Sequence, residues 1–137
     1  MGYQCVMDLS EIQDYLRGTT LVAFDFETAP LLQYRSDPKA ALDPHLACIV
    51  GISLSTSPGS AIYIPLQHFD GGNADPELAI PYLREALWVN SNVIKIAHNL
   101  AFEAQFLYAL GIVLQPPCYD TIAAAQLTLK SDFEFRG

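Results

Sequence analysis

The sequence has 137 residues, of which 51% are hydrophobic and 16% are charged, and this balance excludes intrinsic disorder. Fifteen acidic against seven basic residues give a net charge of −8, which excludes a protein that coats DNA through clustered Lys and Arg side chains. There is no apolar run of about 18 residues and no signal-peptide pattern, so we expect a cytoplasmic protein without a membrane span.

The length predicts a single domain that covers residues 1–137. The cysteines, Cys5, Cys48 and Cys118, are far apart and lack the spacing of a zinc site, so we expect reduced, partly buried thiols.

The first half of the chain predicts mainly strands. In chain order we expect a strand at 3–7, a helix from Asp8 or Ser10 to about Arg17 with Gly18 ending it, a central strand at 21–26, an exposed excursion at 33–45, and a hairpin of strands 47–55 and 60–65.

The second half predicts alternating helices and strands. We expect a helix from Pro76 capped by Asp75, a buried strand at 93–97, a helix at 100–110 capped by Asn99 and stopped by Gly111, an extended piece at 118–119, and a helix from Thr121 to about Lys130 capped by Asp120. Strands followed by this alternation indicate an α/β fold with a mixed sheet.

Two carboxylates stand at the end of the predicted central strand. Asp25 and Glu27 are two residues apart and therefore point to the same face, while Phe24 and Phe26 point to the core. Like charges this close raise one another's pKa, and a divalent cation such as Mg²⁺ or Mn²⁺ relieves the repulsion. The alternative is a pair of carboxylates at a solvated strand end.

A third acidic residue follows another buried strand. Glu103 lies one helical turn after Asn99, so we expect it on the same helix face, at the margin of the core and near the strand ends where α/β sheets bind ligands. The alternatives are a solvated Glu103, a structural His98, and an Asp120 that only caps a helix.

Five short segments follow one another in an order known from one family: 24–28, 50–53, 63–65, 98–103 and 118–121. Phe24-Asp25-Phe26-Glu27-Thr28 and His98-Asn99-x-x-Phe102-Glu103 resemble the first and second motifs of the DEDD 3′–5′ exonucleases. Val50-Gly51-Ile52-Ser53 and Tyr63-Ile64-Pro65 resemble the proofreading domain of family A DNA polymerases of bacteria and phages. The resemblance implies a ribonuclease H-like mixed sheet with flanking helices.

The resemblance also implies a site. Asp25, Glu27 and Glu103 would hold two Mg²⁺ or Mn²⁺ ions, with Glu103 standing where the family usually has Asp. Thr28 and Asn99 would contact the terminal nucleotide or orient the carboxylates. Tyr119 would stack on a base, or alternatively pack in the core.

The family's third motif, Tyr-x-x-x-Asp or His-x-x-x-x-Asp, does not occur after Asp120, because Asp132 and Glu134 lack the Tyr or His partner. We therefore expect a domain whose C-terminal part is missing, with weak or no activity by itself. The uncovered sheet would expose apolar residues of the strands at 21–26 and 93–97, which favours a homo-oligomer or a complementing partner chain.

The function that follows from this resemblance is proofreading: metal-dependent hydrolysis at the single-stranded 3′ end of DNA, beside a polymerase domain. One alternative is an exonuclease similar to ribonuclease D that acts on RNA. Another is a non-catalytic module that completes its fold with a partner chain. Arg35 and Lys39 in the excursion would reach phosphates if it were a lid, and otherwise belong to a solvated loop.

Overall fold

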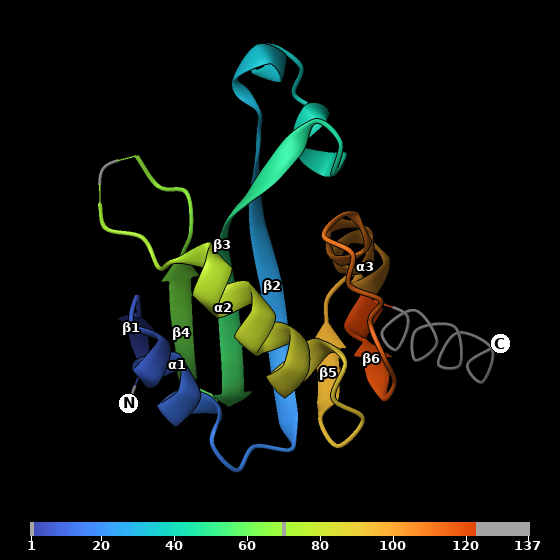
Figure 1. The fold of residues 1–137 in the computed structure, drawn as a ribbon. Coiled ribbons are helices and arrows are strands. Elements are labelled where there is room, and N and C mark those ends of the chain that lie inside the picture. Colours follow the sequence, from blue (N-terminus) through green and yellow to red (C-terminus); the bar gives the residue numbers. More distant parts are fainter. Residues whose placement is uncertain (1, 70, 123–137) are drawn as a thin grey trace, which may run out of the picture.

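The computed structural model describes residues 2–69 and 71–122, which form a six-stranded sheet in the order β1-β4-β3-β2-β5-β6 (Figure 1). The strands are β1 (Tyr3–Cys5), β2 (Leu21–Pro30), β3 (Ala47–Ser57), β4 (Ser60–Pro65), β5 (Ile94–Ala97) and β6 (Cys118–Asp120). The central strands β2, β3 and β4 pair antiparallel, and β1, β5 and β6 join through parallel pairs. The predicted mixed α/β sheet is thus confirmed.

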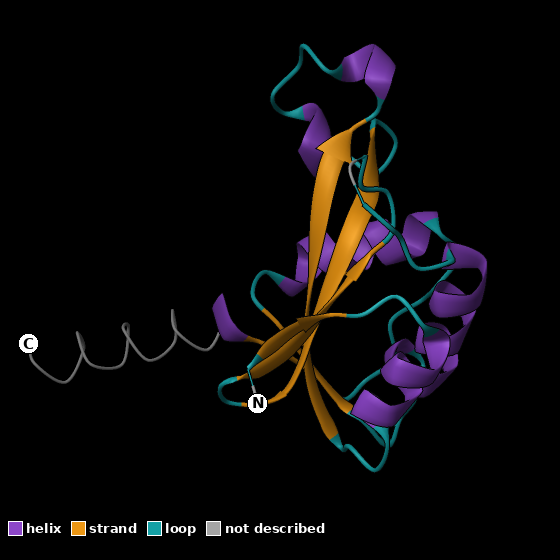
Figure 2. Cartoon of the chain, turned by 90° about the vertical axis from the view of Figure 1, so that its left-hand side faces the viewer, coloured by secondary structure: helices purple, strands orange, loops and turns teal. Residues whose placement is uncertain are grey.

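Three α-helices accompany the sheet in the described part of the chain: α1 (Leu9–Leu16), α2 (Pro76–Leu83) and α3 (Leu100–Ala109). Directly after α2 the chain continues as a π-helical segment, η3 (Arg84–Trp88). Asp75 caps α2 as predicted, because its carboxylate accepts a hydrogen bond of 2.9 Å from the Glu77 amide. Helices α1 and α2 pack on the same face of the sheet (Figure 2).

The core forms between the helices and the face of β2 that carries its buried apolar side chains. Phe24 and Phe26 are buried, and their rings meet the ring of Trp88 edge-on at centroid distances of 6.1 and 5.7 Å. This aromatic cluster fixes which face of β2 turns inward. Asp25 and Glu27 must therefore lie on the opposite face, where both are exposed.

Beyond the sheet, β2 and β3 continue upward and carry the predicted excursion (Figure 1). It contains two short 3₁₀ turns, η1 (Leu32–Tyr34) and η2 (Ala40–Leu42). Most of it is exposed as expected, but Ala40 is buried. The hydroxyl of Thr28 donates a hydrogen bond of 2.7 Å to the Ala41 carbonyl and ties the excursion to β2.

The expectation of a bare apolar sheet is wrong for most of the residues concerned. Of the apolar side chains in the two strand segments, those of Leu21 and Ile94 remain exposed, at 44% and 41%, and that of Ile96 is partly buried. Five further apolar side chains are buried because they face the helices rather than the open face. These buried residues are Val22, Phe24, Phe26, Val93 and Ala97.

Three further expectations concern chain ends and side chains. The cysteines are free as predicted, although Cys5 is exposed rather than partly buried. No helix within residues 2–69 and 71–122 is long and apolar enough to cross a membrane. Past Ile122, the predicted helix to Lys130 and the acidic residues Asp132 and Glu134 lie outside the described residues.

Candidate active site

Asp25 and Glu103 form the centre of the site. The predicted common face of Asp25 and Glu27 is confirmed, since both are exposed on β2 while Phe24 and Phe26 are buried behind them. Glu103 reaches β2 from α3, where its Oε2 accepts a hydrogen bond of 3.2 Å from the Phe26 amide. The Phe26 amide directly follows Asp25 in β2. The Glu103 carboxyl group that it holds also forms a hydrogen bond with the Asp25 carboxylate.

The sequence predicted Glu103 at the margin of the core. In the structure its side chain is buried and only 1% exposed. The reason is the helical period: Phe106 and Leu107 follow it by three and four residues on the same side of α3 and are also buried. Asn99, which was expected on this face, is exposed. The site therefore contains a carboxyl group removed from water.

Burial, the charge of Asp25 and a hydrogen bond with the Asp25 carboxylate together raise the pKa of Glu103 from 4.5 to about 8, and burial contributes most. The Phe26 amide opposes this shift but does not cancel it. The ion pairs of the described residues, Arg17–Asp14 and Arg84–Glu85, lie elsewhere. The Asp25–Glu103 pair thus holds a proton near neutral pH and has no cationic partner among the described residues.

The chemistry of this pair fits a divalent cation. Carboxylate oxygens are the ligands that Mg²⁺ and Mn²⁺ prefer, and a cation would replace the proton that the pair otherwise needs. Within residues 2–69 and 71–122, however, no three His, Cys, Asp or Glu side chains converge closely enough to hold a metal ion together. The structure brings Asp25 and Glu103 together and does not bring Glu27 to them.

Glu27 instead contacts a tyrosine from β4. The Tyr63 hydroxyl donates a hydrogen bond of 2.8 Å to Glu27 Oε2 and lies 2.6 Å from Nε2 of His68. Burial, and then the neighbouring Glu27, raise the pKa of Tyr63, so its hydroxyl keeps its proton. Sequence reasoning assigned neither Tyr63 nor His68 to the site, although Tyr63 belongs to a quoted segment.

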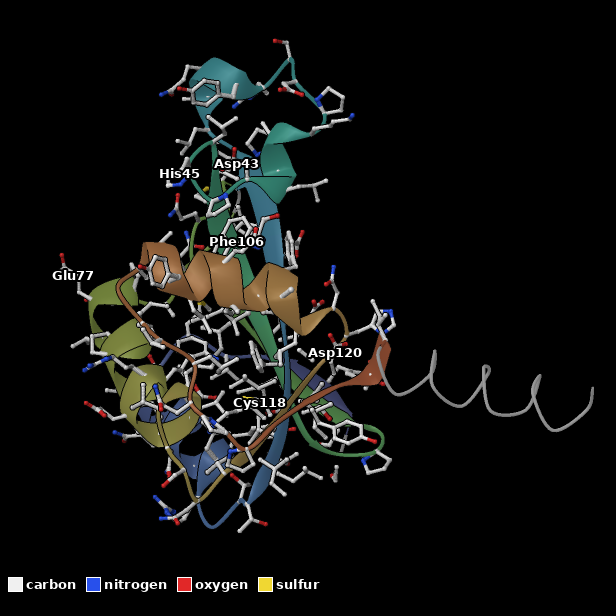
Figure 3. The ribbon with its side chains drawn as sticks, turned by 90° about the vertical axis from the view of Figure 1, so that its right-hand side faces the viewer. Asp43, His45, Glu77, Phe106, Cys118 and Asp120 are labelled. Atoms are coloured by element: carbon white, nitrogen blue, oxygen red, sulfur yellow. The ribbon has the colours of Figure 1, made fainter. Side chains whose placement is uncertain are left out.

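The start of α3 is held differently from the prediction. Asn99 does not cap the helix through its side chain; it adopts a left-handed conformation with φ of 67°. The Asp120 carboxylate accepts hydrogen bonds of 3.1 Å from the amides of Asn99 and Leu100, and one of 2.9 Å from Ile122. Figure 3 shows Asp120 beside the beginning of α3. Asp120 therefore caps the start of α3, as an acceptor that sequence order alone does not reveal.

A cleft of 430 Å³ borders Asp25 on the open face of the sheet. Its lining includes His98, whose Nδ1 lies 2.8 Å from the Thr121 hydroxyl. Tyr119 is 56% exposed, which excludes the alternative that it packs in the core. A larger hollow of 650 Å³ lies between the excursion and α3, near Asp43 and His45 (Figure 3), and none of the three predicted carboxylates lines it.

The fold resembles solved nuclease structures. A structure of Brucella melitensis NrnC bound to pGG aligns with a TM-score of 0.62 and 21% identity, over 95% of this chain and 53% of that one. NrnC with bound Mg²⁺ aligns with a TM-score of 0.61 and 22% identity, over 95% and 54%. Trypanosoma brucei RNase D in complex with RNA U12 gives a TM-score of 0.63 and 15% identity, over 88% and 37%. These likenesses confirm the ribonuclease H-like fold.

Sequence comparison gives closer relatives. DNA polymerase I of Chloroflexus aurantiacus is 28% identical over 122 residues, which cover 87% of this chain and 11% of that protein. DNA polymerase I of Rhizobium leguminosarum is 31% identical over 134 residues, with coverages of 81% and 12%. The chain thus spans only a small part of these relatives. The 3′–5′ exonuclease family matches residues 3–135, and the chain belongs to this family.

Proposed function

We propose that the chain is a 3′–5′ exonuclease domain that hydrolyses the terminal phosphodiester bond at single-stranded 3′ ends of DNA, as the proofreading domain beside a polymerase domain. The observation that carries this proposal is the buried Glu103 carboxyl group against Asp25, with a pKa raised to about 8 and a cleft alongside. Membership in the exonuclease family and the two DNA polymerase I relatives support DNA as the substrate.

Asp25 and Glu103 are the residues that would hold a divalent cation, and Glu27 would join them from the same face of β2. Such ions, when bound, supply a nucleophilic water at neutral pH and stabilise the charge on the leaving 3′ oxygen. The presence of Mg²⁺ in a structure of Brucella melitensis NrnC supports this assignment. Two of the three ligands already stand in contact, which lowers the cost of gathering them.

The surrounding residues would orient these ligands and the DNA end. Asp120 fixes the first turn of α3, and this helix carries Glu103. Asn99 and Tyr119 are exposed and neighbour two residues that line the cleft, His98 in the chain and Ile96 in the sheet. They would contact the terminal nucleotide, with the Tyr119 ring stacking on a base. Thr28 would act from β2, where its hydroxyl also anchors the excursion through Ala41.

The test is degradation of a 5′-labelled single-stranded DNA oligonucleotide in Mn²⁺, compared between the wild type and Asp25→Asn. We expect release of mononucleotides from the 3′ end and a loss of about 10²- to 10³-fold in the variant, as for the removal of one preorganised electrostatic group. Asp14→Asn is the matched control, because Asp14 is a 65% exposed carboxylate on α1. It should retain wild-type activity.

An RNA oligonucleotide of the same sequence decides the substrate class. Faster degradation of RNA would replace the proofreading proposal with an RNA exonuclease similar to ribonuclease D. Equal activity of Asp25→Asn and the wild type would contradict the assignment of the site. Absence of both Mn²⁺ binding and hydrolysis would favour the non-catalytic module.

A further inference from the structure

Tyr63 reaches Glu27 across an intervening strand. Glu27 on β2 lies opposite Gly51 on β3, and Tyr63 stands on β4, the strand on the other side of β3. The Tyr63 ring therefore crosses over Gly51 before its hydroxyl donates to Glu27 Oε2. This contact spans three strands and needs a clear path over the middle one.

Gly51 provides that path. A Cβ atom at position 51 would overlap the Tyr63 hydroxyl and the ring carbon that bears it. Gly51 has no left-handed φ angle, so its backbone conformation alone does not require glycine. A glycine inside a strand weakens the strand, unless it makes room for a group that approaches closely. Here that group is the phenol of Tyr63.

His68 completes the arrangement from the loop after β4. A hydroxyl has one proton, and Tyr63 donates it to Glu27, so Nε2 of His68 must be the donor to the Tyr63 oxygen. Asn73 holds the backbone of His68 through two hydrogen bonds, of 2.8 Å to its amide and 3.0 Å to its carbonyl. The hydrogen bonds therefore run from the loop through His68 and Tyr63 to Glu27.

We propose that Tyr63 and His68 are positioning residues that hold Glu27 Oε2 so that Oε1 stays available to a divalent cation beside Asp25. Within the described residues the Glu27 carboxylate accepts no second hydrogen bond, which leaves Oε1 free. The inference rests on the proposed function and deepens it by naming what orients the third ligand. An exposed glutamate otherwise samples many rotamers, so fixing it lowers the entropy lost when a cation binds.

The experiment measures Mn²⁺ affinity by calorimetry for the wild type, Tyr63→Phe and His68→Ala, together with kcat and KM on single-stranded DNA. Mutation of a group that orients a metal ligand typically lowers metal affinity or activity by about 10- to 100-fold. We expect Tyr63→Phe to weaken Mn²⁺ binding and kcat by about tenfold with an unchanged KM for DNA, and His68→Ala to weaken both by less. Tyr15→Phe is the matched control, because its hydroxyl bonds Ser60 and the Thr56 amide and none of the three carboxylates.

A double-mutant comparison separates positioning from general destabilisation. In a Glu27→Gln background, Tyr63→Phe should have no further effect on Mn²⁺ affinity. Gly51→Ala should reproduce the Tyr63→Phe loss, because the new methyl group displaces the phenol. If Asp25→Asn abolishes Mn²⁺ binding but Tyr63→Phe and His68→Ala bind like the wild type, this inference is overturned and the proposed function stands. If the wild type binds no Mn²⁺, both are overturned.

Discussion

Two charged side chains are buried in the described part of the molecule, and they are held in opposite ways. Lys95 on β5 is 0% exposed, and its ammonium group donates hydrogen bonds of 2.7 Å to the carbonyls of Asn90 and Gln115. Glu103 on α3 is 1% exposed, and its carboxyl group lies against the carboxylate of Asp25. The buried ammonium group has oppositely polarised partners, whereas the buried carboxyl group faces another carboxylate and keeps its proton.

The difference separates a charge with a structural role from a candidate functional group. Burial lowers the pKa of Lys95, but its two carbonyl acceptors stabilise the charged form where it stands. Burial raises the pKa of Glu103, and Asp25 raises it further instead of compensating. A carboxyl group held at such a cost is a candidate for cation binding, because perturbed carboxyl pairs gather at sites where charge is used.

The largest difference between the two buried groups is expected in the pH dependence of stability. We expect it when Glu103→Gln is compared with the wild type in the absence of metal. Between pH 4.5 and about 8 the unfolded chain ionises Glu103 while the folded chain keeps it protonated, so wild-type stability falls as pH rises. The full shift corresponds to on the order of 5 kcal/mol. The amide can accept from Phe26 and donate to Asp25 without ionising, so the variant should escape this loss.

Urea unfolding between pH 5 and pH 9 in a chelating buffer measures this difference. The free energy of unfolding of Glu103→Gln should exceed that of the wild type above pH 8 and approach it towards pH 5. Saturating Mn²⁺ should restore the wild type at high pH. A wild type and a variant with parallel pH profiles would show that Glu103 ionises normally.

The next effect is expected from Lys95→Met, which removes the donor but keeps an apolar side chain of similar length. The carbonyls of Asn90 and Gln115 would each lose a charged hydrogen-bond donor and keep only the Val93 amide and the Cys118 thiol, which costs about 3 kcal/mol in total. Urea unfolding at pH 7 measures the loss, and Lys39→Met serves as the exposed control. A loss equal to that of the control would mean that Lys95 is not a structural charge.

A smaller effect is expected from Asp120→Ala. This carboxylate stands near the site but accepts three backbone amide hydrogen bonds. We therefore expect it to have a structural role, as Lys95 does, and not a role in cation binding as proposed for Glu103. Loss of a helix cap costs about 1–2 kcal/mol of stability. Mn²⁺ affinity, measured by calorimetry, should stay close to the wild-type value. A strong loss of Mn²⁺ affinity would instead make Asp120 a metal ligand.

The sequence predicted local features well because they depend on neighbours in the chain. The alternation around Asp25 and Glu27 is a property of the strand itself, and the capping role of Asp75 follows from its place before Pro76. The burial of Glu103 could not be predicted in the same way, because it depends on how α3 lies against β2.

Contacts between distant segments were missed for the same reason. Asp120 caps a helix that begins 20 residues earlier in the chain, and Tyr63 reaches Glu27 from 36 residues away. A glycine inside a strand, such as Gly51, often marks a place where another group approaches closely. This signal could have predicted a close contact over Gly51, which the structure shows to be that of Tyr63. Lys95 in a buried strand was a comparable signal for an internal acceptor.

The central claim is that the Asp25–Glu103 pair exchanges a proton for a divalent cation. Calorimetric titration with Mn²⁺ at pH 7, in two buffers of different ionisation enthalpy, counts the protons released on binding. Because the pKa of Glu103 is raised to about 8, we expect the wild type to release about one proton per bound cation, and Glu103→Gln to release none. Mn²⁺ binding by the wild type without proton release would contradict the account.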